Sequence, residues 1–402
     1  MVKRGLAVFL FAAWLASALP AQAQAPSKHA GGHGRGRPAA SLAIGAAFAP
    51  SGELWIVGLD AEQRLVVQTS ADDGKTWSPP RPLDTHGDTP AADAEARPKI
   101  AFHPQGRFVV VTYTQPLGRP YTGTIRMLRS DDGGRTFSAP FTVHRDRQTI
   151  THRFDAVAFD AKGTLHTLWV DKRDAEASLA GGRSDYRGAA IYRNESTDGG
   201  LTFGRDLKLS DHSCECCRIA LAPSPDGGLV TLWRHVYAPN QRDHAFAPVA
   251  TTSVDRDPVR ATFDRWALDA CPHHGPALAA ARGGGYHAVW FGERDGVAAV
   301  RYARLSAAGR PQGEPIALPD SAAEHADVLS AGPRVAVVWR SFDGQGTRWR
   351  AWLSQDGGLN FALRELGLTD GENDHPRLVR RNQEVFTLWR TTKGVQVERL
   401  FP

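Results

Sequence analysis

The chain has 402 residues, 42% of them hydrophobic, and a formal net charge of +5 at pH 7. Its positive charges are dispersed, without a basic block or a basic helix, which argues against nucleic acid as a partner. This length allows either two ordinary domains or one large repeat domain.

The first residues carry two positive charges, then a short apolar run, then small residues. This order is typical of a secretory signal peptide, so we expect one over residues 1–25 and a protein that is periplasmic or secreted. Residues 26–41 are rich in Gly, His and Arg and predict a flexible leader. No later segment is apolar for long enough to predict a transmembrane span in the mature chain.

Beyond this leader, a β-rich segment that often contains tryptophan recurs roughly every 55 residues. Each copy follows a small-residue apolar segment and a polar turn, which predicts a hairpin. No stretch shows a sustained helical period. The seven copies are ELWIVGL from 53, FVVVTYT from 108, LHTLWVD from 165, LVTLWRH from 229, YHAVWFG from 286, VAVVWRS from 335 and VFTLWRT from 385.

A second motif, Ser-x-Asp-x-Gly-x-Thr-aromatic, occurs at one place within the units. Its copies are SADDGKTW (70–77), SDDGGRTF (130–137), STDGGLTF (196–203) and SQDGGLNF (354–361), the last with Asn360 in place of Thr. The pattern predicts a tight turn in which Asp accepts bonds from nearby amides and the aromatic ring packs between sheets.

These four motifs are Asp boxes, and the chain resembles the sialidase-like β-propeller superfamily over its whole mature length. The resemblance implies an all-β fold over residues 42–402. We expect a seven-bladed β-propeller of four-stranded antiparallel blades, with the six-bladed sialidase type as the alternative. The last unit ends after its third strand, so a segment near residues 37–42 is expected to complete it.

Aligning the starts of the units brings the chain's four cysteines together. CECCRIAL begins unit four and CPHHGPAL begins unit five, so both motifs precede the innermost strand of adjacent blades. Histidines stand at the matching positions of units three, six and seven. We therefore expect convergence at the mouth of the central channel of Cys214, Cys216, Cys217, Cys271, His273 and His274, with His325 and His375 nearby.

Three interpretations of this cluster remain open. Thiolates and imidazoles together suit copper or zinc. In an exported protein the four cysteines can instead form two disulfides, one of them between blades. A mixture of one disulfide and a His-rich metal site is a third arrangement.

Three arginines follow the tryptophan of the second strand in units four, six and seven: Arg234, Arg340 and Arg390. Arginines at this face are candidates for binding a carboxylate or another anion. The alternative is that they pair with acids on the rim, such as Asp171, Asp174, Asp243 and Asp343.

Three functions follow from these patterns. The first is an exported propeller with a Cys/His metal site of copper or zinc and a binding or metal-dependent role. The second is an exo-sialidase or related glycoside hydrolase, although the superfamily's late tyrosine nucleophile is missing because no tyrosine follows Tyr302. The third is a non-catalytic glycan- or protein-binding propeller with structural disulfides. In each case we expect a monomer with a small anionic or glycan ligand.

Overall fold

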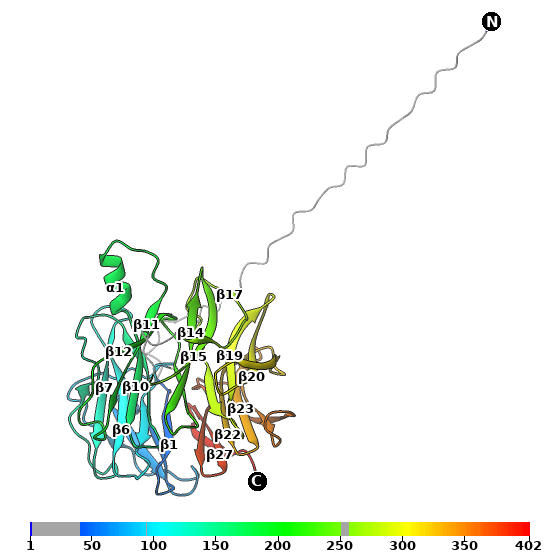
Figure 1. Ribbon diagram of the computed structural model, residues 1–402. Helices are drawn as coiled ribbons and strands as arrows, with labels where there is room; N and C mark the ends of the chain where they lie inside the picture. The colour runs from blue at the N-terminus through cyan, green and yellow to red at the C-terminus, as the bar shows by residue number, and fades with distance from the viewer. Residues whose placement is uncertain (2–40, 94, 251–256) are drawn as a thin grey trace. The chain divides into compact units, whose positions relative to one another are not determined.

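The computed structural model describes residues 1, 41–93, 95–250 and 257–402. The predicted signal peptide and almost all of the predicted leader lie outside the described residues. A compact unit extends from Ala40 to Pro402. In the described part of this unit the structure is built from antiparallel β-sheets (Figure 1), which confirms the predicted all-β fold.

The innermost strands are 4 to 9 residues long, and most of them contain small apolar residues. These strands are β1 (Gly45–Phe48), β5 (Lys99–Phe102), β9 (His152–Phe159), β13 (Ala220–Pro223), β18 (Ala277–Ala280), β22 (Ala323–Ala331) and β26 (Arg377–Arg381). Each lies beside the next in chain order, and β26 lies beside β1. The innermost strands therefore form a closed ring, consistent with the predicted seven blades.

The second strands are the most buried, because each carries a large ring or branched side chains toward the neighbouring blade. They are β2 (Leu54–Leu59), β6 (Val109–Pro116), β10 (Leu165–Asp171), β14 (Leu229–Tyr237), β19 (Tyr286–Arg294), β23 (Arg334–Phe342) and β27 (Glu384–Thr391). Trp169, Trp233, Trp339 and Trp389 are each at most 1% exposed. Burial of such rings removes a large apolar area from water and stabilises the contacts between blades.

The third strands continue the antiparallel pairing outward. They are β3 (Leu65–Ser70), β7 (Gly123–Ser130), β11 (Ala189–Ser196), β15 (Gln241–Pro248), β20 (Val297–Leu305), β24 (Thr347–Ser354) and β28 (Gly394–Arg399).

Outer strands complete the units before the last one. They are β4 (Arg81–Pro82), β8 (Phe141–Thr142), β12 (Leu207–Ser213), β16 (Val259–Arg260), β21 (Pro311–Ala317) and β25 (Ala362–Thr369), with β17 (Trp266–Ala267) also pairing with β15. One pair, Ser213 with His235, joins β12 to β14 and links the third and fourth units into one sheet.

In the described residues, the last unit has three strands, β26, β27 and β28. The segment expected to complete it lies partly outside the described residues, and its described part, Ser41 and Leu42, forms no strand. Among the described residues, hydrogen bonds that involve side chains join the last unit to the first. Ile44, just before β1, donates its backbone N–H to Asp374 of the last unit at 3.0 Å.

The Asp boxes form the turns after β3, β7, β11 and β24, and they share one hydrogen-bond pattern. In the first, Thr76 donates its backbone N–H and its hydroxyl to Asp72 at 2.8 and 2.6 Å, and Gly74 N–H donates to Ser70 at 2.8 Å. In the last, the Asn360 amide donates to Asp356 at 2.8 Å and replaces the threonine hydroxyl. These boxes define the fold and lie away from the site described below.

The long polar loop after β10 contains a helix that the sequence patterns did not indicate. This helix, α1 (Arg173–Ala180), lies at the end of the unit where β17 is also found (Figure 1). Among the described residues, no helix is long and apolar enough to cross a membrane.

Candidate functional site

The Glu95 side chain contacts residues from four other units of the ring. Its side chain is 3% exposed. It accepts hydrogen bonds from the Arg218 guanidinium and backbone N–H, both at 3.0 Å, and from the Gly275 N–H at 3.1 Å. Burial alone would raise the pKa of Glu95, but the charge of Arg218 and a hydrogen bond from His325 hold it well below its ordinary value.

Three of the predicted histidines stack beside this carboxylate. The ring centroids of His274 and His325 are 4.1 Å apart, and those of His325 and His375 are 3.3 Å apart. The Nδ1 atoms of His325 and His375 lie 3.3 and 3.7 Å from Glu95 Oε1. Burial lowers the pKa of all three histidines, so the neutral imidazole predominates near pH 7 and each ring keeps a nitrogen lone pair, as a metal ligand requires.

Glu324 connects this buried cluster to solvent. Its side chain is 32% exposed, and its Oε2 lies 3.8 Å from His325 Nε2. Its Oε1 lies 2.9 Å from Arg340 Nε. His325 therefore lies between a half-buried carboxylate, Glu324, and a fully buried one, Glu95.

A cavity of about 240 Å³ lies among the innermost strands, next to this cluster. Three arginines line it: Arg97, Arg218 and Arg377. Arg97 pairs with Asp374 at 2.8 Å, and Arg377 Nε lies 3.5 Å from Asp327. Nη1 of Arg377 is buried without a hydrogen-bond partner, and burial lowers the pKa of this arginine to about 10.

The cysteines of unit four form a second cluster beside the first. Cys214, Cys216 and Cys217 are buried, and their sulfur atoms are 3.6–4.0 Å apart. Cys271 from the next unit is exposed, and its sulfur is not among the three sulfur atoms that lie within 4.8 Å of one another. The four cysteines are free in this structure.

The structure thus divides the expected Cys/His convergence into two adjacent clusters. Cys217 precedes Arg218, and His274 precedes Gly275, and both following residues bind Glu95. His273 is exposed and takes part in neither cluster. Three cysteine thiols therefore lie together, and three of the predicted histidines lie together, but the two groups do not form one ring of ligands.

The three predicted arginines connect neighbouring blades. Arg234 donates to the carbonyls of His274 and Phe291 at 2.8 and 2.7 Å. In the same way, Arg340 donates to the Asn373 carbonyl at 3.0 Å, and Arg390 to the Leu59 carbonyl at 2.8 Å.

The rim acids have other partners. Asp171 pairs with Arg173, Asp174 with Lys208, Asp243 with Arg260 and Asp343 with Arg348. The alternative of pairing with rim acids is therefore wrong for these four acids, each of which has another partner, although Arg340 does lie 2.9 Å from a different acid, Glu324.

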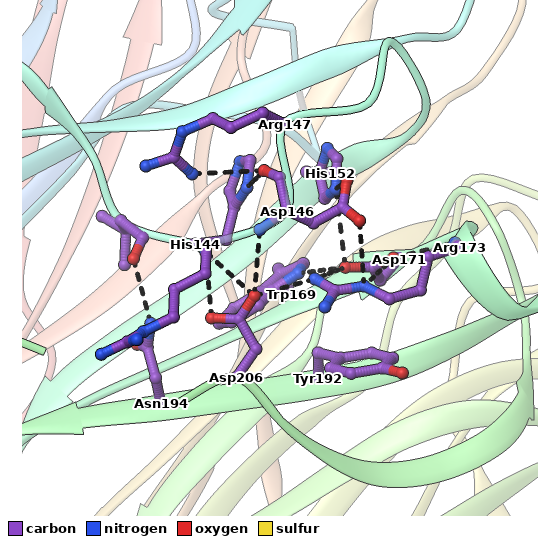
Figure 2. A network of polar contacts seen from close by, with 12 residues as sticks. His144, Asp146, Arg147, His152, Trp169, Asp171, Arg173, Tyr192, Asn194 and Asp206 are labelled. Carbon is purple, nitrogen blue, oxygen red and sulfur yellow. Dashed lines mark hydrogen bonds and ion pairs between the residues drawn. The ribbon is translucent and has the colours of Figure 1, made fainter. Parts of the chain in front are cut away.

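His152, the matching histidine of unit three, belongs to a separate network (Figure 2). It stacks on His144 with ring centroids 3.9 Å apart, and its Nε2 lies 3.2 Å from Asp146. Arg173 joins Asp171 and Asp206 in the same network at 2.7 and 3.0 Å. This network holds the base of α1 against β10.

Sequence reasoning missed Glu95, Arg218 and Glu324 as members of the site. A signal was present, because Glu95 and Arg218 are charged residues that shortly precede the innermost strands β5 and β13. Only the fold shows that the two meet across the ring.

Residues 20–244, more than half of the chain, match the family model of the BNR repeat-like domain. The chain belongs to this family. No curated protein was found to match it.

Solved structures share the fold of this BNR repeat-like protein at low identity. An ulvan lyase, from a new family of polysaccharide lyases and bound to -[GlcA(1-4)Rha3S]-, is 10% identical with a TM-score of 0.56, over 90% of this chain and 94% of its own. The polysaccharide lyase Uly1 is 9% identical with a TM-score of 0.51, over 92% of each chain. The α-L-arabinofuranosidase of Fusarium graminearum in complex with arabinobiose is 12% identical with a TM-score of 0.50, over 74% of this chain and 87% of its own.

Proposed function

We propose that this BNR repeat-like protein cleaves an anionic glycan at the end of the ring axis, with Glu324 transferring the proton. The observation that carries the proposal is the line Glu324–His325–Glu95. A half-exposed carboxylate is backed by a neutral imidazole, which is held in turn by a buried carboxylate. A reacting group oriented by a second and a third group is the usual arrangement for acid–base catalysis.

The charges around the line favour an acidic sugar. Arg340 lies beside Glu324 at the surface, and Arg97, Arg218 and Arg377 line the adjoining cavity. The buried Nη1 of Arg377 has no partner and is available to an anionic group. The ulvan lyase with the same fold is bound to a glycan that contains glucuronate, which supports a uronate as the first substrate to test.

In this proposal Glu324 contacts the substrate, whereas His325 and Glu95 position it. Glu324 gives a proton to the leaving oxygen or takes one from the sugar ring, and the charge of Arg340, 2.9 Å away, stabilises the carboxylate form between events. Arg340 keeps Glu324 oriented toward the mouth of the ring. Hydrolysis and β-elimination both need such a group, and their products distinguish the two reactions.

A tyrosine nucleophile of the sialidase type has no support at this position. None of the described residues that line the cavity is a tyrosine. Tyr302, the last tyrosine in the chain, donates or accepts a hydrogen bond with His287 at 2.7 Å and packs on Phe361, in the core between blades.

The test is a screen of the purified chain against glucuronate-containing polysaccharides and fluorogenic sialosides. Elimination creates an unsaturated sugar, which is detected by its absorbance in the far ultraviolet. Hydrolysis creates a new reducing end without this absorbance. Glu324→Gln should lower kcat by about 10²–10⁴-fold. Glu314→Gln is the matched control, because Glu314 is 84% exposed on the outer strand β21. Cleavage that is unaffected by Glu324→Gln, or no cleavage and no binding of any acidic glycan, would refute the proposal.

A further inference from the structure

The sulfur atoms of Cys214, Cys216 and Cys217 form a nearly equilateral triangle. Their separations are 3.7 Å between Cys214 and Cys216, 3.6 Å between Cys214 and Cys217, and 4.0 Å between Cys216 and Cys217. A metal–sulfur bond of about 2.3 Å places two sulfurs about 3.8 Å apart at the tetrahedral angle and about 4.0 Å apart in a trigonal plane. The observed triangle therefore has the dimensions of a thiolate metal site.

From this geometry we propose that the loop between β12 and β13 binds one thiophilic metal ion, Zn²⁺ or Cu⁺, through these three cysteines. Cys271 of the neighbouring blade lies outside this group of three sulfur atoms, so it supplies the fourth ligand of a tetrahedral ion only by moving its side chain toward them. Thiolate ligands select exactly these soft or borderline ions over Ca²⁺ and Mg²⁺, which require oxygen. This inference does not depend on the proposed glycan chemistry.

The surroundings of the triangle suit a buried anionic centre. The three cysteines pack in an apolar core with Ala96, Ile219 and other side chains of the two adjoining blades. Arg242 Nη1 donates to Cys214 Sγ at 3.5 Å, and the charge of Arg234 also acts on Cys214. Four thiolates on Zn²⁺ and three on Cu⁺ both carry a net charge of −2, which the two guanidinium groups offset.

A bound ion would connect the loop to the site on the axis. Cys217 is followed directly by Arg218, whose backbone N–H and guanidinium both hold Glu95. Fixing Cys217 on a metal therefore fixes the residue that places Glu95. Cys271 would add a link between the fourth and fifth blades on the same face.

The histidine cluster is a competing location for a metal, because Glu95, His325 and His375 also bring ligand atoms within 4.8 Å of one another. The thiol triangle is the stronger candidate for two reasons. Its separations match one bond length and angle, and its thiols have few alternative partners. Glu95, in contrast, is already occupied by Arg218 and Gly275.

The experiment measures metal content and spectra of the full chain, purified without added chelator. Zinc and copper are quantified by elemental mass spectrometry, and thiols are counted after denaturation with and without chelator. We expect about one ion per chain. Cys217→Ser should reduce this content by more than tenfold. His273→Ala, an exposed neighbour of Cys271, and His375→Ala, in the other cluster, should retain it.

Cys271→Ser distinguishes the two ions, since it should weaken Zn²⁺ binding by at least tenfold and leave three-coordinate Cu⁺ in place. If Cys217→Ser does not fold, Co²⁺ added to the chelated wild type provides a second measurement. Intense sulfur-to-cobalt charge-transfer absorption supports the thiolate site. Two disulfides with no free thiol would overturn the proposal, as would an ion lost in His375→Ala but kept in Cys217→Ser, or a Co²⁺ complex without thiolate bands.

Discussion

Glu95 and Arg218 form a two-point contact across the ring although they are 123 residues apart in the chain. Glu95 begins the second blade and Arg218 the fourth, and both side chains are under 10% exposed. Gly275, His325 and His375 contact the same carboxylate. With Glu95 and Arg218, these residues come from five different units. Glu95 is thus the hub of this end of the ring, by which we mean the one side chain that contacts all of these units.

Removing the charge of the hub should destabilise the whole unit. Glu95→Leu leaves the buried Arg218 guanidinium without its counter-charge, so we expect a loss of about 3–5 kcal/mol in the free energy of unfolding. Chemical denaturation checks this. Glu62→Leu, whose side chain is 66% exposed, should change stability by less than about 0.5 kcal/mol. Equal stability of the two variants would show that the hub contributes nothing.

The arginine at the junction of the last and first blades should matter more than its exposed counterparts. Arg390 donates to the Leu59 carbonyl, and this charged hydrogen bond spans the closure of the ring. Arg390→Met should cost about 1.5–3 kcal/mol of unfolding free energy. Arg364→Met is the control, because Arg364 is 44% exposed and pairs only at the surface. A smaller effect for Arg390→Met than for Arg364→Met would contradict a closing role.

The fold could be predicted from the sequence because the motifs that indicate it are local and repeated. Asp boxes and tryptophan-bearing hairpins each depend on residues within one turn or one strand pair, so four and seven copies reinforce one another. The helix α1 was missed, since a single eight-residue segment in a polar loop has no repeat to support it. The contacts of Asp374 with Ile44 and Arg97 at the closure of the ring were also missed, because they join opposite ends of the chain.

The candidate site was only partly accessible for the same reason. Register correctly placed Cys214, Cys216 and Cys217 together, since they occupy one loop. Register did not predict that the thiols and the rings of His274, His325 and His375 form two clusters, because the direction of each side chain depends on the local backbone of its blade. The backbones of His273 and His325 both have positive φ, 53° in each case, and this local geometry has no signature in the sequence.

The Asp boxes predict how the fold responds to acid. Hydrogen bonds from the Thr76 hydroxyl and backbone lower the pKa of Asp72 from 3.8 to about 2. Since the folded-state pKa is depressed, this contribution to stability is present above about pH 4 and is lost as the pH falls toward 2. The melting temperature should decline over this range in the wild type and less steeply in Asp72→Asn. A curve for Asp72→Asn that runs parallel to the wild type would contradict the assignment.

The fourth Asp box offers a test of the turn itself. Asn360 donates to Asp356 through its amide just as Thr76 donates to Asp72 through its hydroxyl. Asn360→Thr should therefore be neutral within about 0.5 kcal/mol, whereas Asn360→Val, which removes the donor, should cost about 1 kcal/mol. Thermal unfolding of the three proteins measures both differences. Equal melting temperatures for the Thr and Val variants would mean that the side-chain bond does not support the turn.

Sialidase activity should be absent or very weak in this chain. The mechanism expected from the superfamily requires a tyrosine that attacks the sugar, and Tyr302 is instead buried between blades, bonded to His287 and packed on Phe361. Sialic acid release from a fluorogenic sialoside should therefore remain at the level of a control without protein. The Tyr302→Phe variant should lose some stability with its hydrogen bond, yet its glycan-cleaving activity should be unchanged. Sialic acid release that disappears in Tyr302→Phe, while the variant remains folded, would mean that the tyrosine reaches the substrate and that the chemistry proposed for Glu324 is wrong.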